Sequence, residues 1–338
     1  MSRQNRIALI RKIEGKRGSK LLCCVTSDRQ NALGVLAKDF IPLFFEHLKR
    51  FPGQTRIDVF LSTDGGDSLA AFGLSRLLRE FTEFVAVLIP LKCHSAGTLF
   101  ALGANRIVMA RPATLSPVDP SVTGHLNPVV EIIPGQRQLL PVSVESVAGF
   151  RSLVTEEWQL NPDGVSTAFR LLAERINPLA LGDVYRSRQQ IERLARTLLT
   201  LHRDDQEDIQ QIILKLTRTF GSHDYLISRK EASALLGSQV EPMDEDLETL
   251  ASSLLADFRE EMKLGQLFDF GMVAHAAMAA GQKPPISDEQ KAVMIESDSG
   301  GDEFERSIQL SVTQPIAPPG APATIQSKVI RAGWKHYN

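Results

Sequence analysis

The 338-residue chain has few cysteines, little net charge and no long apolar run. Its three cysteines, Cys23, Cys24 and Cys93, provide neither a disulfide framework nor the paired spacing of a zinc site, which favours a reducing compartment. The 38 basic and 40 acidic side chains leave a formal charge of -2, so the total does not indicate nucleic-acid binding. The longest apolar run, residues 84–91, is too short to cross a bilayer, and no integral membrane segment is expected.

The first 19 residues mix apolar and basic side chains. Ile7, Leu9, Ile10 and Ile13 share one helical face among arginines and lysines, which predicts an amphipathic arm over residues 1–19. A solvated arm that packs on a neighbour is favoured over a membrane-binding helix. Because its charges are scattered through a short apolar stretch, the segment is a poor signal peptide, and we expect a cytoplasmic protein.

From residue 20 onward, strand-like and helix-like patterns alternate. Strands are predicted at 21–26, 56–62, 84–90 and 106–110, and helices at 34–50, 68–81 and 95–104. This alternation predicts an α/β fold with a mostly parallel sheet that is covered on both faces. In such sheets, ligands bind at the carboxyl ends of the strands.

The remaining two thirds of the chain are less regular. Residues 111–141 are rich in proline and glycine, which predicts a long loop with a short hairpin around 129–140. Helices are predicted at about 144–160, 163–176, 183–202, 205–219 and 228–236. A helical C-terminal extension is expected over 241–283, and a disordered tail over 284–338 that includes a tether at Pro315–Pro322.

Two glycine-containing turns, here called elbows, follow neighbouring predicted strands. The first elbow spans residues 62–67 and the second spans residues 93–98. Acyl transfer by serine needs a nucleophilic oxygen, a base and two donors for the oxyanion. Ser95 is the candidate nucleophile, and the N–H groups of Ala96 and of Gly65 or Gly66 are the candidate donors. Either elbow alone is more simply explained as a tight turn with a helix cap, but two at equivalent strand ends favour a site.

An ordered series of motifs carries a more specific resemblance. It comprises residues 61–66, 94–98, 104–109 and 115–120, followed by 223–227 and 230–232. This series, which spans about residues 20–240, resembles the serine dehydrogenase proteinase family, relatives of signal peptide peptidase A in the Clp-protease/crotonase superfold. The resemblance implies a ClpP/crotonase-like fold built from β-β-α and βα units, with Ser95 as nucleophile and Gly65 and Ala96 in the oxyanion hole. It further implies ATP-independent hydrolysis of peptide or unfolded protein substrates without metal or cofactor, and a homo-oligomer.

The general base is not at the positions that this resemblance suggests. The predicted strand at 106–110 runs into Arg111, where Clp-type proteases place a histidine, and no lysine lies between Lys92 and Lys215, where signal peptide peptidases place theirs. Histidine suits general-base chemistry near neutral pH. His223, beside Asp224 in a motif that the family shares, is the first candidate, although a histidine that braces a strand end is an equally open interpretation.

Other polar residues near the motifs are more simply explained by structure. His94 neighbours Ser95, but adjacent side chains at an elbow usually diverge, and a lone loop histidine such as His125 is usually exposed. The expected structural roles of the rest are a basic strand end for Lys92, a turn for Asp119, a helix cap for Asp67 and a buried apolar position for Cys93.

Two alternatives to a peptidase stay open at this point. The elbows could belong to a catalytically inactive scaffold or assembly protein, which the missing lysine and the displaced histidine favour. They could also hold the enolate of a coenzyme A thioester in a crotonase-type enzyme, but a hydroxyl at position 95 favours hydrolysis, since enolate stabilisation needs only N–H donors there.

Overall fold

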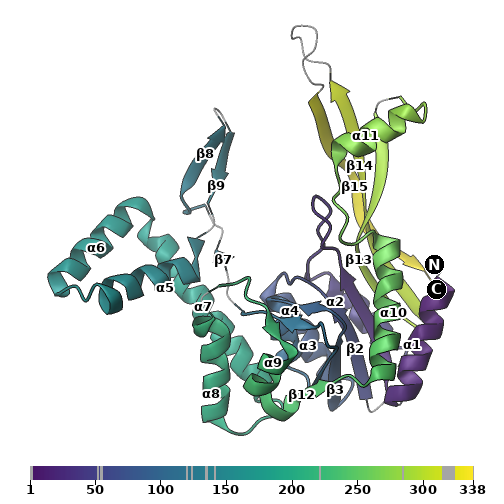
Figure 1. Cartoon of the computed structure of the whole chain (residues 1–338), viewed down its shortest axis with the longest axis horizontal. Helices are drawn as coiled ribbons and strands as arrows, with labels where there is room; N and C mark the ends of the chain where they lie inside the picture. Colours follow the sequence, from purple (N-terminus) through teal and green to yellow (C-terminus); the bar gives the residue numbers. More distant parts are fainter. Residues whose placement is uncertain are drawn as a thin grey trace. The chain divides into compact units, whose positions relative to one another are not determined.

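The computed structural model describes residues 3–51, 53, 56–118, 121–122, 125–133, 136–140, 142–220, 222–283, 285–313 and 324–337 (Figure 1). The chain divides into two compact units. Unit 1 comprises Met1–Leu115 and Ser228–Asn338, and unit 2 is the insertion Ser116–Ile227. This division differs from the boundaries after residues 19, 240 and 283 that the sequence suggested, because segments far apart in the chain pair in one sheet.

Unit 1 is built on an eight-stranded sheet with the order β12-β5-β3-β2-β1-β13-β14-β15. The first five strands of that order run parallel: β12 (Val240–Pro242), β5 (Arg106–Met109), β3 (Phe84–Ile89), β2 (Arg56–Ser62) and β1 (Lys20–Thr26). The residues of β1 and β2 beyond the first are all buried, as expected for strands that are covered on both faces. The predicted α/β fold with a mostly parallel sheet is confirmed.

Three helices follow the parallel strands. They are α2 (Phe40–Leu48), α3 (Ser68–Arg79) and α4 (Ala96–Leu102). The predicted helix at 34–50 begins only at Phe40, because the backbone before it bonds elsewhere: the N–H of Gly34 donates to Ser27 and that of Leu36 donates to Gly65. A short strand, β4 (Lys92–Cys93), pairs with β6 (Thr114–Leu115) beside this sheet.

The segment that the sequence assigned to a disordered tail contains three long strands. They are β13 (Ile286–Ser297), β14 (Gly300–Thr313) and β15 (Thr324–Tyr337), and β13 pairs antiparallel with β1 (Figure 1). Apolar side chains of this ribbon, including Ile295, Ile308 and Leu310, are buried, which explains why the segment is ordered despite its polar composition. The proposed tether at 315–322 lies outside the described residues.

Helices cover the sheet near both ends of the chain. The helix predicted at 228–236 is α9 (Arg229–Leu236), and the expected C-terminal extension contains α10 (Glu245–Met262) and α11 (Phe270–Ala279). The N-terminal helix α1 (Arg3–Arg17) packs along α10 (Figure 1). It is therefore part of unit 1 and differs from the solvated arm that the sequence suggested.

A buried ionic cluster fixes α1 in place. Arg6 is only 3% exposed, and its guanidinium donates to both carboxylate oxygens of Glu296 at 2.8 Å and to Asp257 at 2.8 Å. The Tyr337 hydroxyl on β15 donates to the same Glu296 carboxylate at 2.6 Å. Burying these charges is tolerable only because each is paired with good geometry.

Unit 2 is mainly helical. Its helices are α5 (Val144–Ser152), α6 (Pro162–Arg175), α7 (Pro178–Leu199) and α8 (Gln206–Leu214). Single π-helical turns, η1 (Leu153–Glu157) and η2 (Lys215–Thr219), follow α5 and α8. The predicted hairpin is present as β8 (Val129–Ile133) and β9 (Gln136–Leu139), and the two-residue strands β7 (Ser121–Val122) and β10 (Val142–Ser143) pair with each other. None of the described helices is long and apolar enough to span a membrane.

Candidate functional site

The two elbows lie side by side at the carboxyl ends of β2 and β3. These strands are parallel neighbours, so the turns that follow them meet at one edge of the sheet. Two backbone hydrogen bonds join the first elbow to the second and to the residue before it: the N–H of Thr63 donates to Lys92 O at 3.1 Å, and the N–H of His94 donates to Thr63 O at 3.0 Å. The sequence prediction that both elbows form a single feature agrees with this geometry.

Each elbow has a glycine where the other elbow approaches. A Cβ added to Gly65 would lie 2.9 Å from the Ser95 Cβ and 3.0 Å from His94 O. A Cβ added to Gly97 would lie 2.7 Å from the Thr63 side chain. Gly65 also has φ +115°, a conformation that L side chains rarely adopt. Glycine is therefore required at position 65 on two independent grounds, and its backbone lies against Ser95.

Ser95 has an unusual backbone conformation. Its φ is +50° and its ψ is -114°, at the junction between β4 and α4, and the residue is half-buried. A non-glycine residue in such a sparsely populated region costs on the order of 1–3 kcal/mol and persists only where the surroundings impose it. Such strain is characteristic of a nucleophile that is presented on a sharp strand-to-helix turn.

The candidate oxyanion donors are not equivalent. The Gly65 N–H donates to Thr63 Oγ1 at 3.0 Å, and that hydroxyl in turn accepts from Thr26 Oγ1 at 2.8 Å. Within the described part of the chain, the N–H groups of Gly66 and Ala96 donate to no protein acceptor. Ala96 N–H, which comes directly after Ser95, can therefore receive an anion in this conformation, whereas Gly65 N–H must first leave Thr63.

A charged network lies beside the second elbow. Lys92 Nζ bridges two carboxylates, at 2.8 Å from Asp28 Oδ2 and 2.7 Å from Asp64 Oδ2. His94 Nδ1 lies 3.5 Å from Asp64 Oδ1, and His94 Nε2 lies 2.8 Å from Thr114 Oγ1. The interaction with His94, followed by that with Lys92, lowers the pKa of Asp64 below its ordinary value against the effect of burial. Burial raises the pKa of Asp28, but the hydrogen bonds from Lys92 and from the Gly265 N–H outweigh it and lower the pKa overall.

This network occupies both ring nitrogens of His94 and the ammonium of Lys92. Neither side chain is oriented as a base for Ser95 in this conformation. Their arrangement instead connects the first elbow, through Asp64, to the second elbow and to β6. The polar network thus stabilises the position of the backbone that carries Ser95.

The other predicted residues are placed as follows. His223, Asp224 and His125 are exposed residues of unit 2, so the pairing of His223 with Ser95 stays a prediction. Asp67 caps α3 as expected, accepting from Leu69 N at 2.8 Å. Asp119 lies outside the described residues.

The three cysteines are fully buried and unpaired. Burial raises the pKa of each thiol, that of Cys24 to about 12, which removes them as nucleophiles near neutral pH. Among the described residues, no group of three or more histidine, cysteine or acidic side chains could hold a metal ion.

The segment that carries the strained serine and the interlocked glycines is similar to a known protein family. Residues 1–138 match the family of ClpP-like SDH-type serine proteinases. The resemblance drawn from the sequence motifs is confirmed over these residues. Both elbows lie inside the matched segment, whereas His223 and Asp224 lie beyond it.

Individual relatives cover only part of the chain. Two uncharacterized proteins of Methanocaldococcus jannaschii are 32% identical over 125 residues and 28% identical over 136 residues. These alignments cover 35% and 37% of this chain, and the chain spans less than half of each relative, 42% and 46%.

Solved structures give weaker likenesses. A variant of the 1510-N membrane-bound stomatin-specific protease has a TM-score of 0.38 at 14% identity, over 63% of this chain and 77% of that chain. A ClpP1 variant from Listeria monocytogenes has a TM-score of 0.37 at 12% identity, over 70% of this chain and 99% of that chain.

Sequence reasoning missed the residues that surround the elbows. Thr63 engages the Gly65 N–H, while Asp28 and Thr114 complete the polar network. Thr63 and Asp64 stand within the first elbow itself, but nothing in the sequence indicates which carboxylate Lys92 pairs with. Asp28 is the second residue after β1, and the rule that parallel strands share a carboxyl edge could have placed it near the elbows.

Proposed function

We propose that this chain is a serine peptidase that hydrolyses peptide bonds through an acyl-enzyme on Ser95. The observation that supports the proposal most directly is the backbone of Ser95, which is held at positive φ where two parallel strands end. The match of residues 1–138 to a family of serine proteinases agrees with a hydrolase at this site. The fold holds Ser95 half-buried, which leaves its hydroxyl within reach of a substrate carbonyl.

In the proposed reaction, Ser95 Oγ attacks the carbonyl carbon of the scissile peptide bond while a base accepts the hydroxyl proton. The negative charge that develops on the carbonyl oxygen is received by Ala96 N–H and by Gly65 N–H once it leaves Thr63. Collapse of the tetrahedral intermediate breaks the C–N bond, and the proton passes to the leaving amine. Water then attacks the ester, which releases the acid and returns the proton to Ser95.

His223 is the proposed base, with Asp224 as its neighbour in sequence. It is an exposed residue of unit 2, and histidine is the side chain most often used as a general acid or base. Peptide or unfolded protein substrates and a homo-oligomeric assembly complete the proposal, and both rest on the family resemblance. No metal or cofactor enters these steps.

A second candidate function is that of a catalytically inactive scaffold with the same fold. One observation favours it: the Gly65 N–H and both ring nitrogens of His94 are engaged within the protein. In a scaffold, these bonds would stabilise the elbows permanently. In a peptidase, the bond between Gly65 and Thr63 must exchange for one to the substrate.

Covalent labelling separates the two candidates. The purified full chain is treated with a fluorophosphonate probe, and the modified peptide is identified by mass spectrometry. A peptidase carries the adduct on Ser95 and loses it in Ser95→Ala, whereas a Ser68→Ala control at the start of α3 keeps it. Loss of labelling in a folded His223→Ala variant would identify the base.

Absence of labelling from a folded wild-type chain, at probe concentrations that saturate an active serine hydrolase, would contradict the peptidase proposal. An adduct on a serine other than Ser95 would contradict the assignment of the nucleophile.

A further inference from the structure

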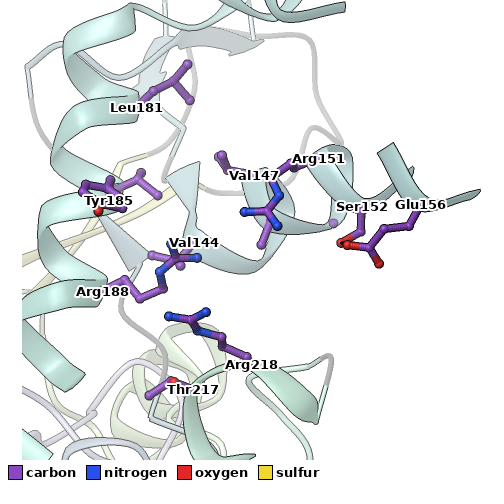
Figure 2. Close-up of a pocket in the computed structure, with 13 residues that line it drawn as sticks. Val144, Val147, Arg151, Ser152, Glu156, Leu181, Tyr185, Arg188, Thr217 and Arg218 are labelled. Atoms are coloured by element: carbon purple, nitrogen blue, oxygen red, sulfur yellow. The ribbon is translucent and has the colours of Figure 1, made fainter. Parts of the chain in front are cut away.

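Unit 2 contains a pocket that is separate from the residues of the proposed peptidase site. Its volume is about 580 Å³, within the range of about 300–1,000 Å³ that is typical of small-molecule sites. All of its lining residues belong to unit 2, from α5, η1, α7 and η2 (Figure 2). The pocket therefore exists within one compact unit, and its chemistry can be considered by itself.

Three arginines face this pocket. Figure 2 shows the guanidinium groups of Arg188 and Arg218 turned toward each other, with that of Arg151 extending into the same space from α5. Neither Arg151 nor Arg188 has an ion-pair partner among the residues that the structure describes. Arg188 Nε is moreover shielded from solvent without a hydrogen-bond acceptor in that part of the chain. Guanidinium groups that converge in this way favour an anion between them.

Among the residues that the structure describes, two carboxylates offset these charges. Glu156 lines the pocket and accepts a hydrogen bond from Ser152 at 3.1 Å, and Glu192 pairs with Arg218 at 2.7 Å. Three arginines against two glutamates leave a single positive charge. One carboxylate would balance it, whereas a dianionic phosphate would overcompensate it.

The rest of the lining is apolar. Val144 and Val184 are buried in a small cluster that forms one side of the pocket, and Leu181 and Val147 extend this surface. Gly149 lies in the interior of α5, where glycine costs up to about 1 kcal/mol relative to alanine. A Cβ added there would meet nothing within 4 Å, so this position leaves the pocket open. A ligand that fits this pocket combines an apolar body with one acidic group.

Two rare backbone turns contribute to the same pocket. Glu156 lies in the π-helical turn η1, and Thr217 and Arg218 lie in η2. π-Helical turns account for well under 1% of residues in proteins and occur frequently at functional sites. Two such turns, from separate helices, present polar side chains to one cavity.

From these observations we propose that the pocket of unit 2 binds an amphiphilic carboxylate. The acidic group of this ligand contacts Arg151, Arg188 and Arg218. Its apolar portion contacts Leu181 and the valines that line the pocket. The carboxylate could come from a free fatty acid or from the C-terminus of an apolar peptide, since both offer the same chemistry. This binding activity is independent of hydrolysis at Ser95.

Calorimetric titration of the full-length Ser95→Ala chain tests the proposal without loss of a peptide probe to hydrolysis. The probes are octanoate, an N-acetylated leucine tripeptide with a free C-terminal carboxylate, and the uncharged amide of each. At least one carboxylate is expected to bind at least about tenfold more tightly than its amide, because a charge-assisted hydrogen bond contributes roughly ten- to a hundredfold. The probe that binds more tightly identifies the source.

Matched variants locate the binding. Arg188→Gln should weaken binding of the carboxylate about tenfold or more. Arg186→Gln should leave that binding unchanged, because the Arg186 side chain is on the same helix but is 80% exposed and paired to Asp183. Gly149→Leu should reduce binding by filling the pocket while it keeps all three arginines. Equal affinity for acids and amides, no binding of either acid at millimolar concentration, or unchanged binding in folded Arg188→Gln would each overturn the proposal. If Gly149→Leu does not fold, the comparison of Arg188→Gln with Arg186→Gln decides.

Discussion

Replacement of Thr63 by valine tests whether the Gly65 N–H takes part in catalysis. Thr63 is fully buried, and its Oγ1 accepts the Gly65 N–H at 3.0 Å. Valine keeps the methyl group that packs near Gly97 but removes the acceptor. If Gly65 N–H must move to an oxyanion, the reaction loses one hydrogen bond between neutral groups, worth about 0.5–1.5 kcal/mol. Without the hydroxyl, that cost disappears, and Ser95 should react about two- to twelvefold faster.

The assay is the second-order rate of fluorophosphonate labelling at Ser95, with thermal unfolding measured in parallel. Thr63→Val alone leaves the Thr26 hydroxyl buried without its acceptor, which costs about 1–3 kcal/mol of stability. The double variant Thr26→Val/Thr63→Val removes both partners and should recover much of that stability while keeping the faster labelling. Thr26→Val alone should label at the wild-type rate, because Thr63 still holds Gly65.

Slower labelling in a folded Thr63→Val chain would refute this reasoning, since it would mean that Thr63 positions Gly65 and does not compete for its N–H. An unchanged rate would mean that Gly65 N–H has no part in the reaction.

Three further predictions concern the elbows and the framework that supports them. Gly65→Ala should reduce Ser95 labelling by more than about tenfold, because the added Cβ would lie 2.9 Å from the Cβ of Ser95. Gly53→Ala, which is also at positive φ but in open space, should label at the wild-type rate. Equal labelling rates in the two variants would contradict the tight contact. Arg6→Met should lower the free energy of unfolding in urea by about 3–5 kcal/mol, because two buried carboxylates lose their counter-charge. Arg11→Met, on the exposed side of α1, should change the free energy of unfolding by less than about 1 kcal/mol. Similar losses in both variants would be inconsistent with a buried cluster. Asp64→Asn should destabilise the chain slightly, by less than about 1 kcal/mol since the side chain is 47% exposed. Because the pKa of Asp64 is lowered in the folded state, the stability difference between wild type and Asp64→Asn should be full above the ordinary pKa of 3.8. It should vanish as the pH falls through the folded-state pKa. Unfolding curves between pH 7 and 2.5 test this, and a stability difference that grows on acidification would have the wrong sign.

The sequence was sufficient to predict four of the five parallel strands, β1, β2, β3 and β5, and the position of the elbows, whereas the three-residue strand β12 was missed. The boundaries predicted for β2 and for the start of α3 agree with the structure because each is marked by a strong local signal. Buried parallel strands are nearly continuous apolar runs, and Asp67 is a favourable cap in front of a helix. Local chemistry of this kind can be read without knowledge of the tertiary structure.

The antiparallel strands could not be predicted in the same way. The first half of β13 contains Asp288, Glu289 and Lys291, and β14 begins with Gly300 and Gly301, a composition that is typical of a disordered tail. Their order comes from pairing with β1 and with one another, which only the tertiary structure provides. The alternation Ile308, Leu310, Val312 was the available signal of a strand with one buried face.

The surroundings of Ser95 were unpredictable for a related reason. The choice of Thr63 as the partner of Gly65, and of Asp28 and Asp64 as partners of Lys92, depends on distances of a few ångströms between separate loops. A base for Ser95 contributed by His223 likewise depends on long-range contacts, so it remains a prediction that labelling must test.

The position of β1 has a consequence for the biosynthesis of the chain. This strand is translated before unit 2, yet one of its two neighbours is β13, which is translated only after the whole of unit 2. Until then, the apolar strand 20–26 has an unpaired edge, and such edges promote association between chains. A ribosome that stalls before residue 286 would therefore carry an aggregation-prone intermediate in which this strand edge is exposed. The nascent protein should depend on chaperones most strongly while unit 2 is being synthesised.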